Sequence, residues 1–343
     1  MQTLTEDNQL KMTGAGITVL DDTIDDIQGE HVEGVSIVKD SKNKTRKGHQ
    51  LVTAHYKDDK KDFPLLYRLY QQKKKLLKIG KEDEFYTKIQ LAIEILTFLI
   101  VAGLISSTIV FDTWYCSAQL INFLQFHELF FVSRLKSNRK VLWQDLWLSV
   151  DELFSLIPST EFKRTVFYTK QKYTFRKKKR KYWTVYLHLQ VQDLGLMTLI
   201  LSKKKLTDTT GYVLITNNDK LSTEEICFLY SQRWSVEVFY RDAKQELHLG
   251  SVIFTRWTAY HRHYYFVFWT YLLLMYLSCY GIIQRQRSLF TRSTAKLKKA
   301  FRDIASESLI LSVVRRAAGN QTAKVVRQLL QDRTSWSYFQ TAL

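Results

Sequence analysis

The chain has 343 residues, of which 45% are hydrophobic, so it can bury a substantial core in one large domain or two small ones. Its 51 Lys and Arg residues outnumber its 33 Asp and Glu residues, which gives a formal net charge of +18. A protein this basic usually binds a polyanion, most often a nucleic acid; a solvated basic surface without a partner is the alternative. The three cysteines lie far apart, which excludes a disulfide framework and a cysteine-rich zinc site.

The N-terminal part of the chain alternates between strand-like and helix-like segments. The expected elements are strands at 16–20, 35–39 and 50–56, a helix at 84–103, a strand at 107–111, a helix at 117–127 and a strand at 129–135. The polar, basic stretch DSKNKTRKGH predicts a turn, and Pro64 predicts a boundary. Strands and helices in this order predict a mixed α/β sheet.

The middle of the chain changes character. Residues 161–216 are rich in strand formers and show no helical period. Within them, residues 163–181 hold ten Lys or Arg residues and no acid, with aromatic residues interspersed. This composition predicts a β-rich insertion with a basic, aromatic face.

A helix is predicted after this insertion. Ser222 and Glu225 have the S-x-x-E spacing of a capping box, which predicts a helix from Thr223 to about Leu247. Tyr230, Glu237 and Lys244 are seven residues apart and share one face of that helix, and Arg233 lies within about 60° of them. A solvated charged face is the ordinary interpretation of such a pattern.

Two apolar runs, at 89–105 and 264–283, have compositions close to those of membrane spans. The first contains Glu94 and is slightly short for a span. The second is long enough, but its aromatic residues lie along its whole length instead of gathering at the two ends. A helix buried on all sides accounts for it equally well.

Acidic residues stand where two of the predicted strands end. Asp21 and Asp22 follow the strand at 16–20, and Asp112 follows the strand at 107–111. Each of them has an ordinary interpretation as a turn residue or a helix N-cap. Together with Glu237 they also suit a site for two Mg²⁺ ions, because Mg²⁺ binds hard oxygen ligands and phosphodiester chemistry uses paired divalent ions.

The spacing Y-x2-R-x3-E-x6-K, formed by Tyr230, Arg233, Glu237 and Lys244, resembles the motif of a large branch of bacterial insertion-sequence transposases of the DDE type. GITVLDDT is similar to the first acidic motif of that family, and STIVFDTWYC is similar to the second. FFVSRLKSNRKV resembles the strand and basic segment that follow. The resemblance runs from about Gly16 to at least Arg262.

The resemblance implies an RNase H-like mixed sheet flanked by helices, with the β-rich insertion before the helix that carries the third acid. It implies an enzyme that cleaves and transfers DNA strands at element ends with two Mg²⁺ or Mn²⁺ ions. Asp112, Glu237 and one residue of the Asp21-Asp22 pair would bind metal. Successive strand side chains face opposite ways, so only one of the pair should face the metal, and we favour Asp22.

The same resemblance identifies candidate DNA contacts and partners. The residues expected to contact DNA are Tyr230, Arg233, Lys244, Arg134, Lys136, Arg176, Lys177 and Lys178. Two protomers would act together on transposon ends and target DNA, in the bacterial cytoplasm and close to the nucleoid, without a membrane.

The expected organisation has five parts. They are an N-terminal remnant at 1–15, the first part of the core at 16–160, the insertion at 161–216, the second part of the core at 217–285 and a basic helical region at 286–343. Relatives usually have about a hundred further residues before the first acidic motif, so the chain resembles an N-terminally shortened member. The alternative function is therefore an inactive, truncated transposase that only binds DNA.

Overall fold

A computed structural model gives the fold of the protein. It describes residues 11–27, 29, 31–39, 44–170, 177–279, 294–300, 302, 303, 305, 306 and 311. The chain divides into two compact units, Met1–Tyr276 and Leu277–Leu343. In the second unit, residues 294–300 are helical. The candidate site lies wholly in the first unit.

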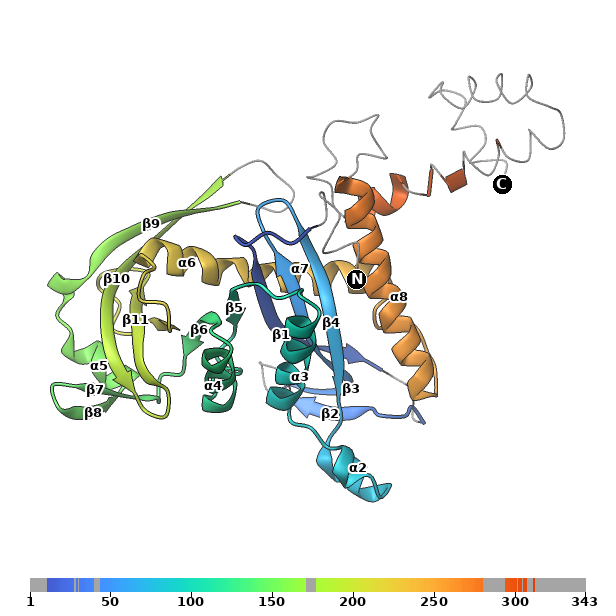
Figure 1. Ribbon diagram of the computed structural model, residues 1–343, viewed down its shortest axis with the longest axis horizontal. Coiled ribbons are helices and arrows are strands. Elements are labelled where there is room, and N and C mark those ends of the chain that lie inside the picture. Colours follow the sequence, from blue (N-terminus) through green and yellow to red (C-terminus); the bar gives the residue numbers. More distant parts are fainter. Residues whose placement is uncertain are drawn as a thin grey trace. The chain divides into compact units, whose positions relative to one another are not determined.

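The strands of the first unit form one mixed sheet (Figure 1). They are β1 (Ile17–Asp26), β2 (Ser36–Lys39), β3 (Thr45–Lys57), β4 (Asp62–Tyr70), β5 (Thr108–Phe111), β6 (Phe130–Leu135), β7 (Lys140–Trp143), β8 (Leu146–Ser149), β9 (Lys163–Lys170), β10 (Lys177–Val191), β11 (Gly195–Lys203) and β12 (Tyr212–Thr216). Their order is β2-β3-β1-β5-β6-β12-β11-β10-β7-β8, with β4 paired to β3 and β9 paired to β10.

The centre of the sheet is parallel and its two sides are antiparallel. Strands β1, β5 and β6 run parallel to one another. Strand β3 pairs antiparallel with β1, and β12 pairs antiparallel with β6. Ile109, Val110 and Phe111 of β5 are fully buried, as expected for a central parallel strand covered on both faces. The mixed α/β sheet predicted from the sequence is confirmed.

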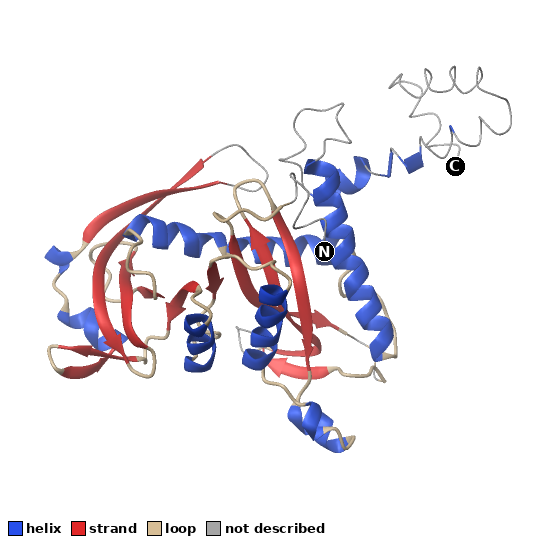
Figure 2. Ribbon diagram, in the orientation of Figure 1, coloured by secondary structure: helices blue, strands red, loops and turns tan. Residues whose placement is uncertain are grey.

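Helices cover the sheet on two sides (Figure 2). They are α2 (Lys73–Lys78), α3 (Lys88–Val101), α4 (Ala118–Phe126), α5 (Val150–Leu156), α6 (Thr223–Gln232), α7 (Trp234–Glu246) and α8 (Trp257–Cys279), with short 3₁₀ helices at Glu82–Glu84 and Ser159–Glu161. Helices α3 and α4 pack together, α3 on β3 and β4 and α4 on β6. Helix α6 packs on β12, β6 and β5, and α7 packs on β1 and β4.

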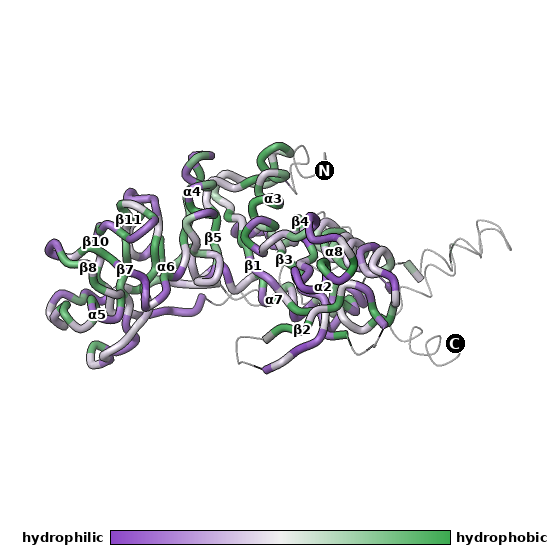
Figure 3. Tube along the Cα trace, turned by 90° about the horizontal axis from the view of Figure 1, so that it is seen from below, coloured by the Kyte–Doolittle hydropathy of each residue, from purple (hydrophilic) through white to green (hydrophobic). Residues whose placement is uncertain are grey.

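Side-chain caps set where the main helices begin. Thr87 and Gln90 form a capping box at α3, so this helix begins at Lys88 and not at Glu84 as the apolar pattern predicted. Ser117 caps α4 at its predicted start. Much of α3 is hydrophobic along its trace (Figure 3), and Leu91, Ala92, Ile95, Leu96 and Leu99 are its buried residues.

Among the helices in the described residues, none is long and apolar enough to cross a membrane.

The predicted boundary at Pro64 is wrong. Pro64 lies inside β4, opposite His55 of β3, where the register between the two strands shifts. Strand β4 pairs only with β3 and is therefore an edge strand. Proline lacks a backbone N–H and is tolerated at edges and irregular positions of a sheet, so it does not end the strand here. The predicted turn before residue 50 is also shorter than expected, because β3 begins at Thr45.

Candidate active site

Asp21 and Asp22 lie within strand β1 and not after it, contrary to the sequence prediction. Strand β1 pairs with β3 over its full length, from Ile17 opposite Lys57 to Asp26 opposite Gly48, and this pairing keeps the acidic residues extended. The parallel pairing with β5 is shorter and ends where Leu20 meets Phe111. The two acids of β1 therefore stand beside the end of β5, where the loop with Asp112 begins.

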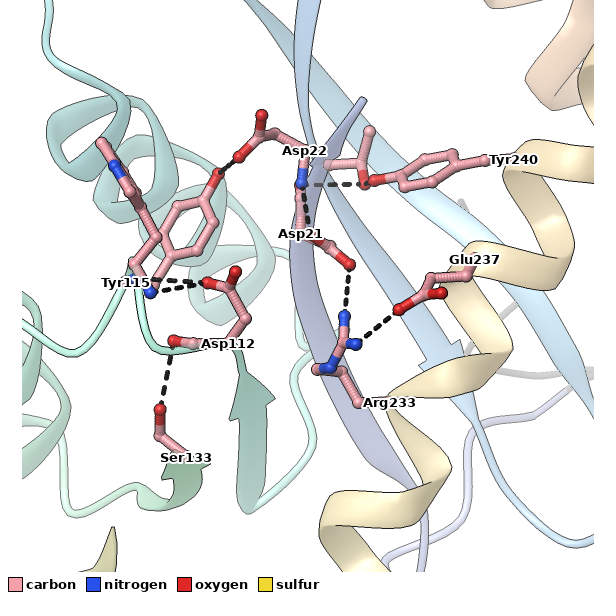
Figure 4. A network of polar contacts seen from close by, with 10 residues as sticks. Asp21, Asp22, Asp112, Tyr115, Ser133, Arg233, Glu237 and Tyr240 are labelled. Atoms are coloured by element: carbon pink, nitrogen blue, oxygen red, sulfur yellow. Dashed lines mark hydrogen bonds and ion pairs between the residues drawn. The ribbon is translucent and has the colours of Figure 1, made fainter. Parts of the chain in front are cut away.

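The side chains of Asp21 and Asp22 face opposite sides of the sheet (Figure 4). Asp21 Oδ2 accepts a hydrogen bond of 2.7 Å from Arg233 Nη1, at the junction of α6 and α7. Thr53, which is opposite Asp21 in β3, hydrogen-bonds Tyr240 of α7. Asp22 instead accepts a hydrogen bond of 2.9 Å from Lys88 Nζ of α3. Asp21 therefore faces α7, and Asp22 faces α3.

Asp112 directly follows β5, as the sequence predicted. Its Oδ1 accepts hydrogen bonds from the backbone N–H groups of Trp114, at 2.9 Å, and Tyr115, at 3.4 Å. Its backbone carbonyl accepts a hydrogen bond from Ser133 Oγ of the neighbouring strand β6. These contacts fix a turn and not a helix N-cap, because the N-cap of α4 is Ser117. Within the described part of the chain, Asp112 Oδ2 has no hydrogen-bond partner.

Glu237 lies in the first turn of α7. The helix predicted from Thr223 to about Leu247 begins as expected at the capping box of Ser222 and Glu225, but it is interrupted at Arg233. Arg233 keeps right-handed helical backbone angles, so Glu237 still follows it by one turn. Arg233 Nη2 donates a hydrogen bond of 2.5 Å to Glu237 Oε1. The same guanidinium group therefore joins Glu237 to Asp21.

Burial and the charges of neighbouring acids raise the pKa values of Asp21 and Asp112. The pKa of Asp21 is raised to about 7 by burial, with Asp112 and Asp22 adding to the increase and Arg233 opposing it. Burial also raises the pKa of Asp112, against the effect of its two backbone N–H donors and of Arg233. Negative groups held this close together favour a bound cation.

The three acids are not a ready-made metal cage. Among the residues that the structure describes, no group of three or more His, Cys, Asp or Glu side chains is arranged to hold a metal ion. Mg²⁺ usually keeps several waters and is held by one or two carboxylates together with substrate phosphates. The carboxylates of Asp21, Asp112 and Glu237 fit that chemistry, since each is a hard oxygen donor and Asp21 and Asp112 repel one another.

Two of the predicted DNA contacts are partly buried. Lys244 Nζ donates hydrogen bonds to the carbonyl of Ile24, at 2.7 Å, and to Thr23 Oγ1, at 3.1 Å, so it joins α7 to β1. Tyr230 is partly buried, and its pKa is raised mainly by burial, with Arg233 and Arg134 opposing. Of the two, Lys244 stabilises the position of α7 in this structure.

Arg233, another predicted DNA contact, is bonded to Asp21 and Glu237. Four further predicted DNA contacts are exposed. Arg134 is exposed on β6, with its guanidinium over the ring of Tyr212. Lys136 follows β6 and is exposed, as are Lys177 and Lys178 at the start of β10. Arg176 lies outside the described residues. Whether these side chains bind DNA stays a prediction.

Three residues that contact the acids were missed by the sequence analysis. They are Gln50 of β3, Lys88 of α3 and Tyr115, all of which hydrogen-bond the carboxylate of Asp22. Tyr115 lies in the second acidic motif, so its position in the sequence was a usable signal. Gln50 and Lys88 lie in segments whose contact with Asp22 depends on tertiary packing.

A second buried acid lies on the same face of β1 as Asp21. Asp25 is fully buried and accepts a hydrogen bond from the hydroxyl of Tyr264, which also hydrogen-bonds His49 Nδ1 at 2.9 Å. Among the described residues, Asp25 Oδ1 has no partner. Burial raises the pKa of Asp25 from 3.8 to about 6, while Tyr264 and Lys244 oppose the increase.

The substitution Asp25→Asn is expected to stabilise the protein more at pH 7 than at pH 4. In the unfolded chain Asp25 ionises near pH 4, whereas in the folded protein it ionises only near pH 6. The folded protein is therefore destabilised relative to the unfolded chain as the pH rises from about 4 to 6, and asparagine, which does not ionise, avoids this loss. The difference of roughly two pKa units corresponds to about 3 kcal/mol. Urea unfolding of wild type and Asp25→Asn at both pH values measures the effect. The same difference in free energy of unfolding between the two proteins at pH 4 and at pH 7 would contradict the expectation.

Comparison with known protein families gives a match over most of the first unit. The family model described as "Transposase DDE domain" matches residues 14–273, which is most of the chain and includes all four acids of the site. No match is found among curated proteins.

Proposed function

The chain belongs to the family of transposase DDE domains, and from this premise we propose that it cleaves DNA strands at insertion-sequence ends and joins them to target DNA. Its mixed sheet flanked by helices is the RNase H-like architecture that the sequence predicted. One observation carries the proposal: Arg233 bonds both Asp21 and Glu237, which come from distant segments, and it also interacts electrostatically with Asp112, which follows β5.

We propose Asp21, Asp112 and Glu237 as the residues that hold the Mg²⁺ or Mn²⁺ ions. Asp21 is preferred to Asp22 because its carboxylate lies on the side of the sheet that faces Glu237. Two bound ions of this kind stabilise the attacking and the leaving oxygen of a phosphodiester exchange. The same chemistry serves both the hydrolytic cut and the strand transfer.

The remaining residues of the site orient these acids and bind the substrate. Arg233 joins Asp21 to Glu237 and therefore fixes the distance between β1 and α7. Its fork of N–H groups also matches the geometry of a phosphate, so it suits a backbone phosphate next to the reacting bond. Lys244 holds α7 against β1 through the contact with the Ile24 carbonyl, which keeps Glu237 in place.

The basic strands provide a surface for the rest of the DNA. Lys177 and Lys178 open β10 opposite Lys170 and Thr169 of β9, and both are exposed. Lysine side chains on such a surface contact phosphates without reading sequence. We further propose that two copies act together on paired ends, close to the nucleoid.

The test is cleavage of a DNA duplex that carries the element's own terminal repeats. Wild-type protein with Mg²⁺ or Mn²⁺ is expected to nick the repeat at its end, and EDTA is expected to stop the reaction. Binding is followed in parallel over a range of salt concentrations, because phosphate contacts weaken as salt rises. Salt-sensitive binding without any cleavage would favour the alternative, an inactive member that only binds DNA.

A further inference from the structure

The carboxylate of Asp22 is bound by side chains from three separate elements. Its Oδ2 accepts hydrogen bonds from Gln50 Nε2 of β3, at 2.7 Å, and from Lys88 Nζ of α3, at 2.9 Å. Its Oδ1 accepts a hydrogen bond of 3.2 Å from the hydroxyl of Tyr115. Both oxygens of Asp22 are therefore engaged within the protein.

Two paths lead from Asp22 to the groups that hold Asp112. The first is direct: Tyr115, which is fully buried, donates its hydroxyl to Asp22 and its backbone N–H to Asp112 Oδ1 (Figure 4). The second passes through Lys88, whose ammonium group lies 4.7 Å from the centre of the Trp114 ring. Trp114 supplies the other backbone N–H to Asp112 Oδ1. Both donors that orient Asp112 thus belong to residues linked to Asp22, Tyr115 directly and Trp114 through Lys88.

We propose that Asp22 is a positioning residue that sets the orientation of the Asp112 carboxylate through Tyr115 and Lys88. The adjacent acids of β1 then have separate tasks, since Asp21 binds the cation and Asp22 fixes the loop that carries the second cation ligand. This inference rests on the proposed function, because it assigns Asp22 a role in the same site. Successive residues of a strand point to opposite faces of the sheet. Asp21 and Asp22 can therefore act on different parts of the site.

The expected loss of metal affinity follows from the role of groups that orient metal ligands. Hydrogen bonds to a ligand, or to the group that carries it, fix its direction, and removing them typically lowers metal affinity or activity about 10- to 100-fold. Asp112 Oδ1 is held by two N–H groups, which directs Oδ2 away from the turn. Loosening Tyr115 or Trp114 would let this carboxylate rotate.

The experiment measures Mn²⁺ binding to the DNA-free, full-length protein by the electron paramagnetic resonance signal of free Mn²⁺. The variants are Asp22→Ala, Asp22→Asn and Tyr115→Phe, and circular dichroism verifies that each is folded. Asp26→Asn is the matched control, since Asp26 is exposed on the same strand and pairs with Arg46. Tyr115→Phe removes one oxygen atom and keeps the buried ring, so it carries the test if Asp22→Ala does not fold.

Asp22→Ala and Tyr115→Phe are each expected to raise the Mn²⁺ dissociation constant about tenfold. The Asp26→Asn control should stay within about twofold of wild type, since it lies outside the contacts of the site. Asp22→Asn keeps an acceptor for the Tyr115 hydroxyl and is expected to lose less than Asp22→Ala. The double variant Asp22→Ala/Tyr115→Phe should bind Mn²⁺ no more weakly than Asp22→Ala alone, because Asp22→Ala already removes the contact that Tyr115→Phe breaks.

Three results would overturn the inference. Wild-type affinity in both Asp22→Ala and Tyr115→Phe would mean that the contacts do not orient Asp112. Complete loss of Mn²⁺ binding in Asp22→Ala, with wild-type affinity in Tyr115→Phe, would make Asp22 itself a ligand. No Mn²⁺ binding and no cleavage by the wild-type protein would remove the proposed function together with this inference, and only that result affects both.

Discussion

Replacing Glu237 with Gln is expected to lower metal-dependent DNA cleavage by about 10³-fold or more, which is roughly 4 kcal/mol of transition-state stabilisation. Glutamine keeps the size of the side chain and one oxygen acceptor, so Arg233 retains a partner on α7. It lacks the negative charge that a divalent cation needs from its ligands. Cleavage of terminal-repeat DNA by both proteins, at equal protein and Mg²⁺ concentrations, measures the effect.

DNA binding separates this loss from unfolding. Glu237→Gln is expected to bind the same DNA within about twofold of wild type, because the phosphate contacts come from basic residues. Glu224→Gln is the matched control, since Glu224 is exposed in the first turn of α6 and lies outside the site. Cleavage by Glu237→Gln at the rate of the control would show that Glu237 takes no part in the chemistry.

Local signals in the sequence predicted the helix that carries Glu237. The capping box of Ser222 and Glu225 gave its start, and the seven-residue spacing placed Tyr230, Glu237 and Lys244 on one face. The interruption at Arg233 could not be predicted in this way. The Arg233 side chain bonds Asp21, which is 212 positions away in the sequence, so its conformation depends on tertiary contacts.

The extent of strand β1 shows the same limit. Apolar residues ended at Leu20, and the acids that follow were interpreted as the start of a loop. The strand continues to Asp26 because the long partner strand β3 supplies hydrogen bonds along its whole length. Pairing with a distant strand thus outweighs the low strand propensity of aspartate.

The choice between Asp21 and Asp22 also depends on tertiary structure. The two-residue period of a strand predicts that the two side chains face opposite ways. It does not predict which face α7 covers, because that depends on how the chain returns after the strands β9–β12. The contacts of Arg233 with Asp21, and of Lys88 with Asp22, supply this information. The sequence therefore predicts the set of acids, and the proposed choice of Asp21 over Asp22 rests on the packing of α7.

Phe239 packs α7 against neighbouring elements through its buried ring. It is fully buried, and its ring contacts Phe268 and Tyr271 of α8 edge-on, with ring centroids 5.2 Å and 4.9 Å away. On the sheet side it lies 5.4 Å from the ring of His55 in β3. Three elements meet at this side chain, two residues after Glu237.

Phe239→Ala is therefore expected to lower the free energy of unfolding by about 3–5 kcal/mol, the usual cost of a large buried cavity. The control is Phe266→Ala on α8, where the side chain is 71% exposed; a surface change of this kind is expected to stay within about 0.5 kcal/mol. Urea unfolding followed by tryptophan fluorescence compares both variants with wild type. Equal stability of the two variants would mean that α7 is held mainly by its polar contacts, with Arg233 bonding Asp21 and Lys244 bonding Ile24. A large loss in Phe239→Ala alone would mean that the folded position of α7, which carries Glu237, depends on the aromatic contacts of Phe239.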